Sequence, residues 1–242
     1  MLTSGVPITL QSVAFRSENP HRDADFWGAV LNRPVESDGG ESFLRGEAGQ
    51  VGIRFTSGPP HAENTNNRLH LHLADGPLDQ SGTIAMCLGL GARLLGSGRI
   101  PENSYAGMAD VAGDEFCVIE DRNAYLAGCG PLAEVTCEGT RTVGLFWSNV
   151  LAWPLVWDEG GETAIQSPAG GTKIAWNGES VMPDAARARQ YFVLTVPGNE
   201  LDHEVRRLLD LGASGHSVGR TGETVLRDPD GYEFEVRPTS AY

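Results

Sequence analysis

Apolar and polar residues alternate strictly from Arg68 to Leu73 in the stretch RLHLHLAD at 68–75. Such alternation predicts a strand with one apolar face and one polar face. Because successive side chains of a strand point to opposite faces, His70 and His72 should lie together on the polar face. They could be ligands to a metal ion, or only two polar residues on a partly wet surface.

Large apolar residues at helical spacing occur in two similar segments, FWGAVLNRPV at 26–35 and FWSNVLAWPL at 146–155. Three further pairs match in the same order at nearly the same spacing: DGGES and EGGET, LGAR and LGAS, GDEFCV and GYEFEV. Random similarities would not keep one order and one spacing, so the chain is predicted to be two copies of one domain. We place the first domain at 1–125 and the second at 126–242.

Both copies show the same predicted order of elements. A short strand, SVAFRS or LAEVTC, precedes a helix and short strands follow it. Asn19 and Pro20 are typical of the cap and first turn of a helix in the first copy. In the second copy Asn199 is expected to cap a helix and Gly212 is well placed to end it. The strand RLHLHL, or QYFVLT in the second copy, then starts the same plan again. The sequence therefore predicts four βαβββ modules, two in each copy.

This order, with FW..VL..P on the first helix, LGA after the second and DPDGYEFEV at the close, resembles the vicinal oxygen chelate superfamily. That superfamily contains glyoxalase I, extradiol dioxygenases and bleomycin-resistance proteins. The resemblance implies an α+β fold of two tandem glyoxalase-like domains, each a pair of βαβββ modules that form a curved sheet around a cup. It also implies a monomeric pseudo-dimer or a homodimer.

The resemblance implies ligand positions for a metal ion: a histidine on the first strand, a histidine opening the second module and a glutamate on the last strand. Such ligands hold a divalent ion with positions open for substrate oxygens. In the first copy these positions fall near Ser12, at His70 with His72 beside it, and at Cys117 with Glu115 on the same strand face. Ser12 is not a usual ligand. The resemblance thus suggests at most one ion (Zn, Fe, Ni or Mn), in the first domain, at His70, His72 and Glu115.

In the second copy the same positions fall near Leu132, at Tyr191 and at Glu235. Only the glutamate is a metal-ligand type there, so no family-type metal site is expected in the second copy. Glu233 lies on the same predicted strand face as Glu235. The candidates for lining a ligand cup are His70, His72, Glu115, Cys117, Tyr191, Glu233 and Glu235.

Other motifs add little chemistry. GHSVG at 215–219 matches the GxSxG pattern of hydrolases, but that motif needs a strand before it and a helix after it. Here the predicted order is the reverse, so Ser217 is not expected to be a nucleophile. Cys117 is more typical of a small apolar filler than of a nucleophile. Trp157 and Trp176 could stack on an aromatic ligand or belong to the core.

The net charge of −14 argues against nucleic acid and anionic membranes as partners. It suits a cationic ligand, and it also serves solubility. Four cysteines without a CxxC pair, no basic and apolar leader, and no long apolar run favour a cytoplasmic location.

Three functions stay open from the sequence. The first is small-molecule binding of the bleomycin-resistance type, with a ligand cup in each domain and no family-type metal triad. The alternative is a divalent-metal-dependent lyase, isomerase or dioxygenase that acts on an oxygenated small molecule in the first domain. The third is a scaffold without any ligand.

Overall fold

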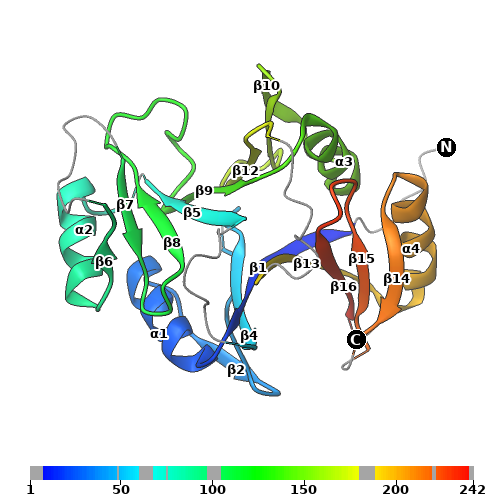
Figure 1. Cartoon of the computed structure of the whole chain (residues 1–242), viewed down its shortest axis with the longest axis horizontal. Helices are drawn as coiled ribbons and strands as arrows, with labels where there is room; N and C mark the ends of the chain where they lie inside the picture. The colour runs from blue at the N-terminus through cyan, green and yellow to red at the C-terminus, as the bar shows by residue number, and fades with distance from the viewer. Residues whose placement is uncertain are drawn as a thin grey trace.

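The computed structural model describes residues 8–47, 49–59, 68–74, 76–96, 105–179, 189–219 and 222–239. In these residues four α-helices and sixteen strands form two eight-stranded sheets (Figure 1). The predicted α+β fold is confirmed. Among the described helices, none has both the length and the apolar character needed to cross a lipid bilayer.

The first copy contains two βαβββ modules. The first module consists of β1 (Thr9–Ser17), α1 (Pro20–Leu31), β2 (Glu36–Asp38), β3 (Glu41–Leu44) and β4 (Gly52–Ser57). The second consists of β5 (Leu69–Leu73), α2 (Gln80–Gly89), β6 (Arg93–Leu94), β7 (Ala106–Ala109) and β8 (Glu115–Val118).

The second copy repeats the plan. The third module consists of β9 (Leu132–Cys137), α3 (Arg141–Leu151), β10 (Leu155–Glu159), β11 (Glu162–Gln166) and β12 (Lys173–Trp176). The fourth consists of β13 (Gln190–Pro197), the 3₁₀ turn η2 (Gly198–Glu200), α4 (Leu201–Asp210), β14 (Ser214–Val218), β15 (Thr224–Arg227) and β16 (Glu233–Thr239).

Local sequence signals explain where helices begin and end. The Asn19 side chain accepts a hydrogen bond from the Arg22 amide at 3.1 Å, and Pro20 opens α1 without losing a backbone donor. Gly212 follows α4 with φ +115°, a conformation that side chains rarely adopt. The boundaries predicted at Asn19 and Gly212 are therefore confirmed. The predicted cap at Asn199 is wrong, because Asn199 lies within the 3₁₀ turn that leads into α4 and Glu200 is the N-cap.

Each sheet takes one module from each copy. Sheet A has the strand order β14-β15-β16-β13-β1-β4-β3-β2 and sheet B the order β10-β11-β12-β9-β5-β8-β7-β6. The copies meet at two antiparallel junctions, β1 with β13 and β5 with β9. Figure 1 shows both junctions near the middle of the molecule. The repeat in the sequence predicts the modules but does not reveal this exchange between copies.

Helices join the two modules within a copy. In the first copy, Trp27 of α1 lies 5.2 Å from Phe116 of β8, measured between ring centroids. In the second copy, Trp147 of α3 lies 5.0 Å from Phe234 of β16. Modules of one copy thus pack through apolar helix faces, and modules of different copies pair through strands, so the two copies interlock.

Two buried ion pairs add a polar link between the sheets. Arg68, just before β5, contacts Asp228, which lies between β15 and β16, at 3.0 Å. Arg189, just before β13, contacts Asp114, which lies between β7 and β8, at 2.5 Å. The two arginines occupy corresponding positions of the two copies, but the acids do not, because the counterpart of Asp228 is Asp110 and the counterpart of Asp114 is Tyr232.

Candidate functional site

The face of each sheet that is turned away from the helices forms a cup, which we call cup A and cup B after its sheet. Strand register shows which positions of the cups correspond. Ser12 of β1 pairs with Val193 of β13, and Glu134 of β9 pairs with His72 of β5. Ser12 and Glu134 are therefore counterparts, and the expected match of Ser12 with Leu132 is wrong.

The error of two residues has a simple cause. Fourteen positions separate Ser12 from Phe26 of the first helix, whereas twelve separate Glu134 from Phe146. The stretch from the cup position of the strand to the equivalent point of the helix is thus two residues shorter in the second copy, and counting at constant offset from the helix misplaces the strand position. Cup B therefore receives the carboxylate of Glu134 from the second copy.

Cup B brings three potential ligand groups together. β5 directs His70 and His72 to the same face, with ring centroids 4.9 Å apart. Cys117 lies beside His72 on the parallel neighbour β8. One ligand atom from each of these three residues falls within 4.8 Å of the others, the one such group of three or more in the described part of the chain.

Glu134 lies on β9, directly across from His72 of β5, and contacts it. Its Oε2 lies 2.8 Å from His72 Nδ1 and accepts a hydrogen bond from Thr136 Oγ1 at 3.1 Å. The residue is only 5% exposed. The other oxygen, Oε1, is buried and makes no hydrogen bond of normal geometry with any described residue. The Tyr125 side chain nevertheless lies close enough to the Glu134 carboxylate to help lower its pKa. Glu134 is the functional candidate that sequence reasoning missed; a single acid in the apolar strand LAEVTC was the available signal.

Burial and neighbouring groups shift the pKa values of this cluster. Burial, with the nearby His72, lowers the pKa of His70 to about 4. Burial alone would also lower the pKa of His72, but its contacts with Cys117 and Glu134 outweigh this and raise it to about 9. Burial would raise the pKa of Glu134, yet the bond from His72 outweighs it and lowers the pKa. Without a ligand, the cluster at neutral pH is thus a neutral His70 beside an ion pair.

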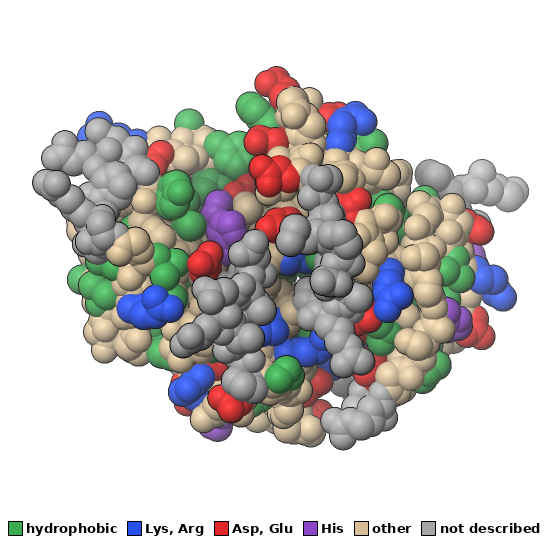
Figure 2. Space-filling view, in the orientation of Figure 1, with side chains coloured by type: hydrophobic (Ala, Val, Ile, Leu, Met, Phe, Trp, Pro, Cys, Tyr) green, Lys and Arg blue, Asp and Glu red, His purple; other side chains and the backbone are tan. Residues whose placement is uncertain are grey.

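A cavity of about 400 Å³ adjoins this cluster and includes Glu134 in its lining. The strands below it contribute the small side chains Thr136, Ala164 and Ala175. Tyr125 and Trp157 flank it with ring centroids 6.2 Å apart, and Trp157 is 41% exposed. Figure 2 shows histidine side chains at the surface near the middle of this view, with acidic side chains close by.

The segment that links the two copies covers part of cup B. Tyr125 belongs to this segment, and the only lysine of the chain, Lys173, places its Nζ 3.7 Å from the centre of the tyrosine ring. The same Nζ donates a hydrogen bond to the Tyr125 carbonyl oxygen. The charge of Lys173 thus holds the link in place.

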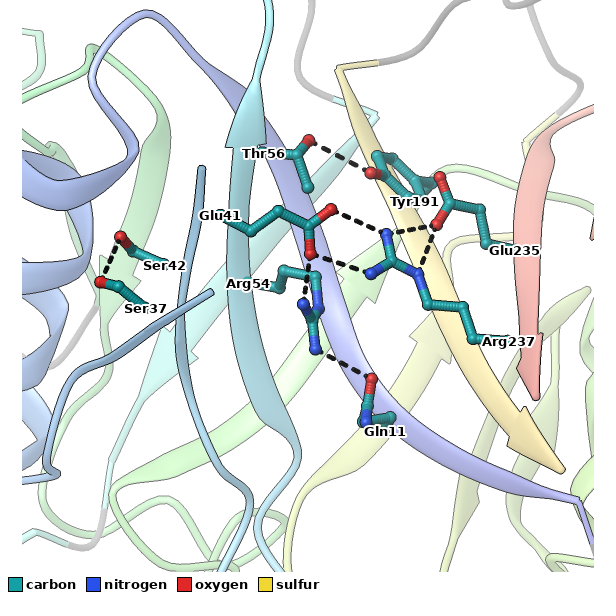
Figure 3. A network of polar contacts seen from close by, with 9 residues as sticks. All are labelled: Gln11, Ser37, Glu41, Ser42, Arg54, Thr56, Tyr191, Glu235 and Arg237. Atoms are coloured by element: carbon teal, nitrogen blue, oxygen red, sulfur yellow. Dashed lines mark hydrogen bonds and ion pairs between the residues drawn. The ribbon is translucent and has the colours of Figure 1, made fainter. Parts of the chain in front are cut away.

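Cup A holds a network of charged and polar side chains (Figure 3). Glu41 accepts hydrogen bonds from Arg237 at 2.9 and 3.1 Å and one from Arg54. Arg237 also donates to Glu235 at 2.8 and 2.9 Å. The Arg54 guanidinium lies 4.6 Å from the ring centre of Phe43. Charges in this cup therefore neutralise one another.

The structure separates the predicted site residues into two groups. His70, His72 and Cys117 lie in cup B, whereas Tyr191 and Glu235 lie in cup A. There Tyr191 lies 3.2 Å from the Thr56 hydroxyl, measured between the two oxygens. Glu233 also belongs to sheet A, where Arg227 donates to it at 3.3 Å.

Glu115 lies apart from the histidines. It is exposed at the first position of β8, and the pairing of β8 with β5 begins one residue later, at Phe116. Cys117, not Glu115, is the residue of β8 that joins the group of potential metal ligands. A ligand role for Glu115 stays a prediction from the sequence.

A family model for the glyoxalase-like domain matches residues 12–119 and again residues 133–237. The chain belongs to the glyoxalase-like domain family. Among curated proteins, none matches the sequence.

Solved structures share the glyoxalase-like fold over nearly the whole chain. Glyoxalase I from Zea mays is 12% identical with a TM-score of 0.62, over 96% of this chain and 92% of that one. A Bacillus subtilis protein named as a candidate dioxygenase is 14% identical with a TM-score of 0.59, over 94% of this chain and 84% of that one. At such identities the similarity shows the fold alone.

The resemblance to metal-bearing members raises the question of whether cup B fits a divalent ion. Two imidazoles and one thiolate are ligand types that zinc accepts, and three protein ligands leave a position open. A metal-bound histidine commonly has its other ring nitrogen bonded to a carboxylate, as His72 is to Glu134. By their donor chemistry the residues of cup B therefore fit one ion, held by His70, His72 and Cys117.

Proposed function

We propose that this protein binds a small molecule at one working site, cup B, rather than at one site in each domain. The observation that carries the proposal is the cavity of about 400 Å³. Its size is in the range of small-molecule sites, about 300–1,000 Å³. In cup A the corresponding space contains the side chains of Phe43 and Arg54, which contact each other.

The side chains around the cavity favour a cationic ligand with a flat apolar part. Glu134 offers a buried oxygen without a normal hydrogen bond, and Glu162 adds a second carboxylate to the lining. Trp157 presents an exposed aromatic surface, and aromatic rings attract ammonium groups, as the Tyr125 ring attracts that of Lys173. An ammonium or other N–H group near Glu134 would supply the missing hydrogen bond.

A thermal-shift screen that pairs aromatic amines with the matching aromatic acids tests this proposal. We expect the amines to raise the unfolding temperature and the acids to have no effect. For a binding amine, Trp157→Ala should weaken the affinity about tenfold, the equivalent of about 1.4 kcal/mol. Val156→Ala, on the same strand and equally exposed, is the matched control. Selective binding of the acids would contradict the proposal.

The second candidate function is a metal-dependent lyase, isomerase or dioxygenase acting on an oxygenated small molecule at the same cup. The grouping of His70, His72 and Cys117 favours it. A bound divalent ion would polarise a substrate oxygen and stabilise negative charge that develops on it. Glu134 would orient His72, and Tyr125 and Trp157 would position the substrate.

Screening of metal-loaded protein with glyoxalase-type and dioxygenase-type substrates tests this candidate. We expect turnover that His72→Ala abolishes and Val156→Ala leaves unchanged. Tight binding of a small molecule without turnover of any substrate, with metal present, would leave binding as the function.

A further inference from the structure

We propose that cup B selects thiophilic divalent ions, with Cys117 as a thiolate ligand beside His70 and His72 and with Glu134 as the residue that positions His72. The proposal concerns the cup of the proposed binding function. It can be tested with metal alone, so the two proposals can fail separately.

The geometry is close to what a tetrahedral ion needs. Ligand atoms of a zinc site with nitrogen and sulfur donors lie roughly 3.3–3.8 Å apart, given metal–ligand distances of about 2.0–2.3 Å. The potential ligand atoms of His70, His72 and Cys117 lie within 4.8 Å of one another. Side-chain rotations that move these ligand atoms by up to about one ångström would close the site around an ion.

Strand register favours sulfur over oxygen as the third donor. Cys117 pairs directly with His72 across the parallel strands, while Glu115 is exposed and outside the pairing. The carboxylate of the cup instead comes from Glu134, whose Oε2 contacts His72 Nδ1. That contact leaves Nε2 of His72 as the nitrogen available to a metal. The Glu134 carboxylate would thus orient a ligand and not bind the ion itself.

Cup A shows why the same positions cannot hold an ion there. The counterpart of His72 is Val193, and the counterpart of Cys117 is Glu235, since Val193 pairs with Glu235 as His72 pairs with Cys117. Glu235 already accepts two hydrogen bonds from Arg237. One cup therefore has the donors, and the other has a carboxylate that is neutralised by a guanidinium.

A thiolate among the ligands determines which ions should bind. Thiolate and imidazole donors favour zinc and cobalt, while manganese and magnesium prefer oxygen donors. We therefore expect cobalt to bind with the near-ultraviolet charge-transfer absorption of a cobalt–thiolate bond. We also expect zinc to displace the cobalt, and manganese at the same concentration to leave it in place.

The experiment is a cobalt titration of chelator-treated full-length protein, followed by absorption spectroscopy. One equivalent should bind with the thiolate band, and Cys117→Ser should lose the band. Cys87→Ala, which alters a buried thiol on α2, should keep both the binding of one equivalent and the thiolate band. Glu134→Gln should keep the band but weaken binding about 10- to 100-fold, as expected for a positioning residue. Glu115→Gln should leave the cobalt affinity and the thiolate band unchanged.

A second measurement covers the case in which Cys117→Ser fails to fold. In the natural protein, zinc should slow alkylation of Cys117 by iodoacetamide at least tenfold, read by peptide mass spectrometry. Cobalt binding without the thiolate band, or loss of binding in Glu115→Gln alone, would overturn the proposal. Absence of cobalt uptake would also overturn it, while amine binding in the same protein would leave the proposed function intact.

Discussion

Where cup A has Phe43 paired with Arg54 across two strands, cup B has Ala164 paired with Ala175. The corresponding strands have the same order and register in both sheets, so the two cups have the same backbone arrangement. The first difference between the cups lies in side-chain volume. Phe43 and Arg54 occupy this space in cup A, whereas cup B keeps a cavity of about 400 Å³.

The cups also differ in how completely their carboxylates are paired with positive charges and hydrogen-bond donors. In cup A, Glu41 is satisfied by two arginines, and Glu235 by one of them. In cup B, Glu134 contacts His72 with one oxygen and leaves the other without a normal hydrogen bond. A fully paired polar network rigidifies a fold, whereas a buried polar atom without a normal hydrogen bond costs stability, which is consistent with a functional role. Cup A thus serves stability and cup B is the candidate for chemistry.

Breaking the network of cup A should have the largest effect. Glu41→Gln leaves Arg54 and Arg237 with less negative charge, and we expect the free energy of unfolding to fall by about 3 kcal/mol. Glu162→Gln changes the corresponding exposed residue of cup B and should stay within about 0.5 kcal/mol. Urea unfolding measures both variants. Equal losses in the two would mean that the cups do not differ in this way.

Filling cup B should convert it into a copy of cup A. The double variant Ala164→Phe with Ala175→Arg places large side chains in the cavity, and we expect at least about a 100-fold loss of affinity for an amine found by screening, about 2.7 kcal/mol. Isothermal titration calorimetry measures the loss. Val156→Arg adds the same charge to the exposed surface of a neighbouring strand and should have little effect. An unchanged affinity in the double variant would place the ligand elsewhere.

The ion pair of cup B should make stability depend on pH. The pKa of His72 is raised from 6.5 to about 9, so between these values the folded protein holds a proton that the unfolded chain releases. The stabilisation is fully present below pH 6.5 and is lost as pH rises through 9, by about 1–3 kcal/mol.

Urea unfolding at pH 6 and pH 9.5, in the presence of a chelator, measures this dependence. His72→Gln should remove the loss of unfolding free energy between pH 6 and pH 9.5 that comes from this ion pair. His216→Gln alters an exposed histidine of β14 and should retain that loss. If His72→Gln retains the whole dependence, the ion pair is not its source.

The smallest effect concerns the tryptophans beneath the two sheets. Trp27 Nε1 donates to Asp110 at 2.9 Å, while Trp147 Nε1 has no hydrogen-bond partner among the described residues. Substitution by phenylalanine removes similar volume from both sites, but only Trp27→Phe leaves a buried carboxylate with one bond fewer. We expect Trp27→Phe to be more destabilising than Trp147→Phe by about 1 kcal/mol, measured by thermal unfolding. The reverse order would refute this account.

Much of the fold follows from local sequence signals. The alternation around His70 and His72 predicts their strand and shared face, and the repeated FW segments predict both long helices. The exchange of modules between copies could not be predicted in this way. The apolar faces of β1 and β5 suit pairing with a strand of either copy, so the pattern is the same for both arrangements.

The candidate site was harder to predict for the same reason. His70, His72 and Cys117 follow from alternation and family positions. Glu134 does not, because it reaches cup B from the other copy and because the stretch between its position and the following helix is two residues shorter than in the first copy. Choosing between Glu115 and Cys117 required the register of β5 against β8, which depends on the pairing of distant segments.

The exchange of modules also has a consequence for how the chain is made. While the ribosome has released only the first copy, β1 and β5 each lack a neighbour on one side. Sheet B can close once β9 emerges, since His72 and Glu134 are 62 positions apart. Sheet A must wait for β13, because its partners Thr9 and Thr195 are 186 positions apart. Until then β1 is an open sheet edge that can pair with another nascent chain, so an interrupted or slowed translation product should be prone to aggregate.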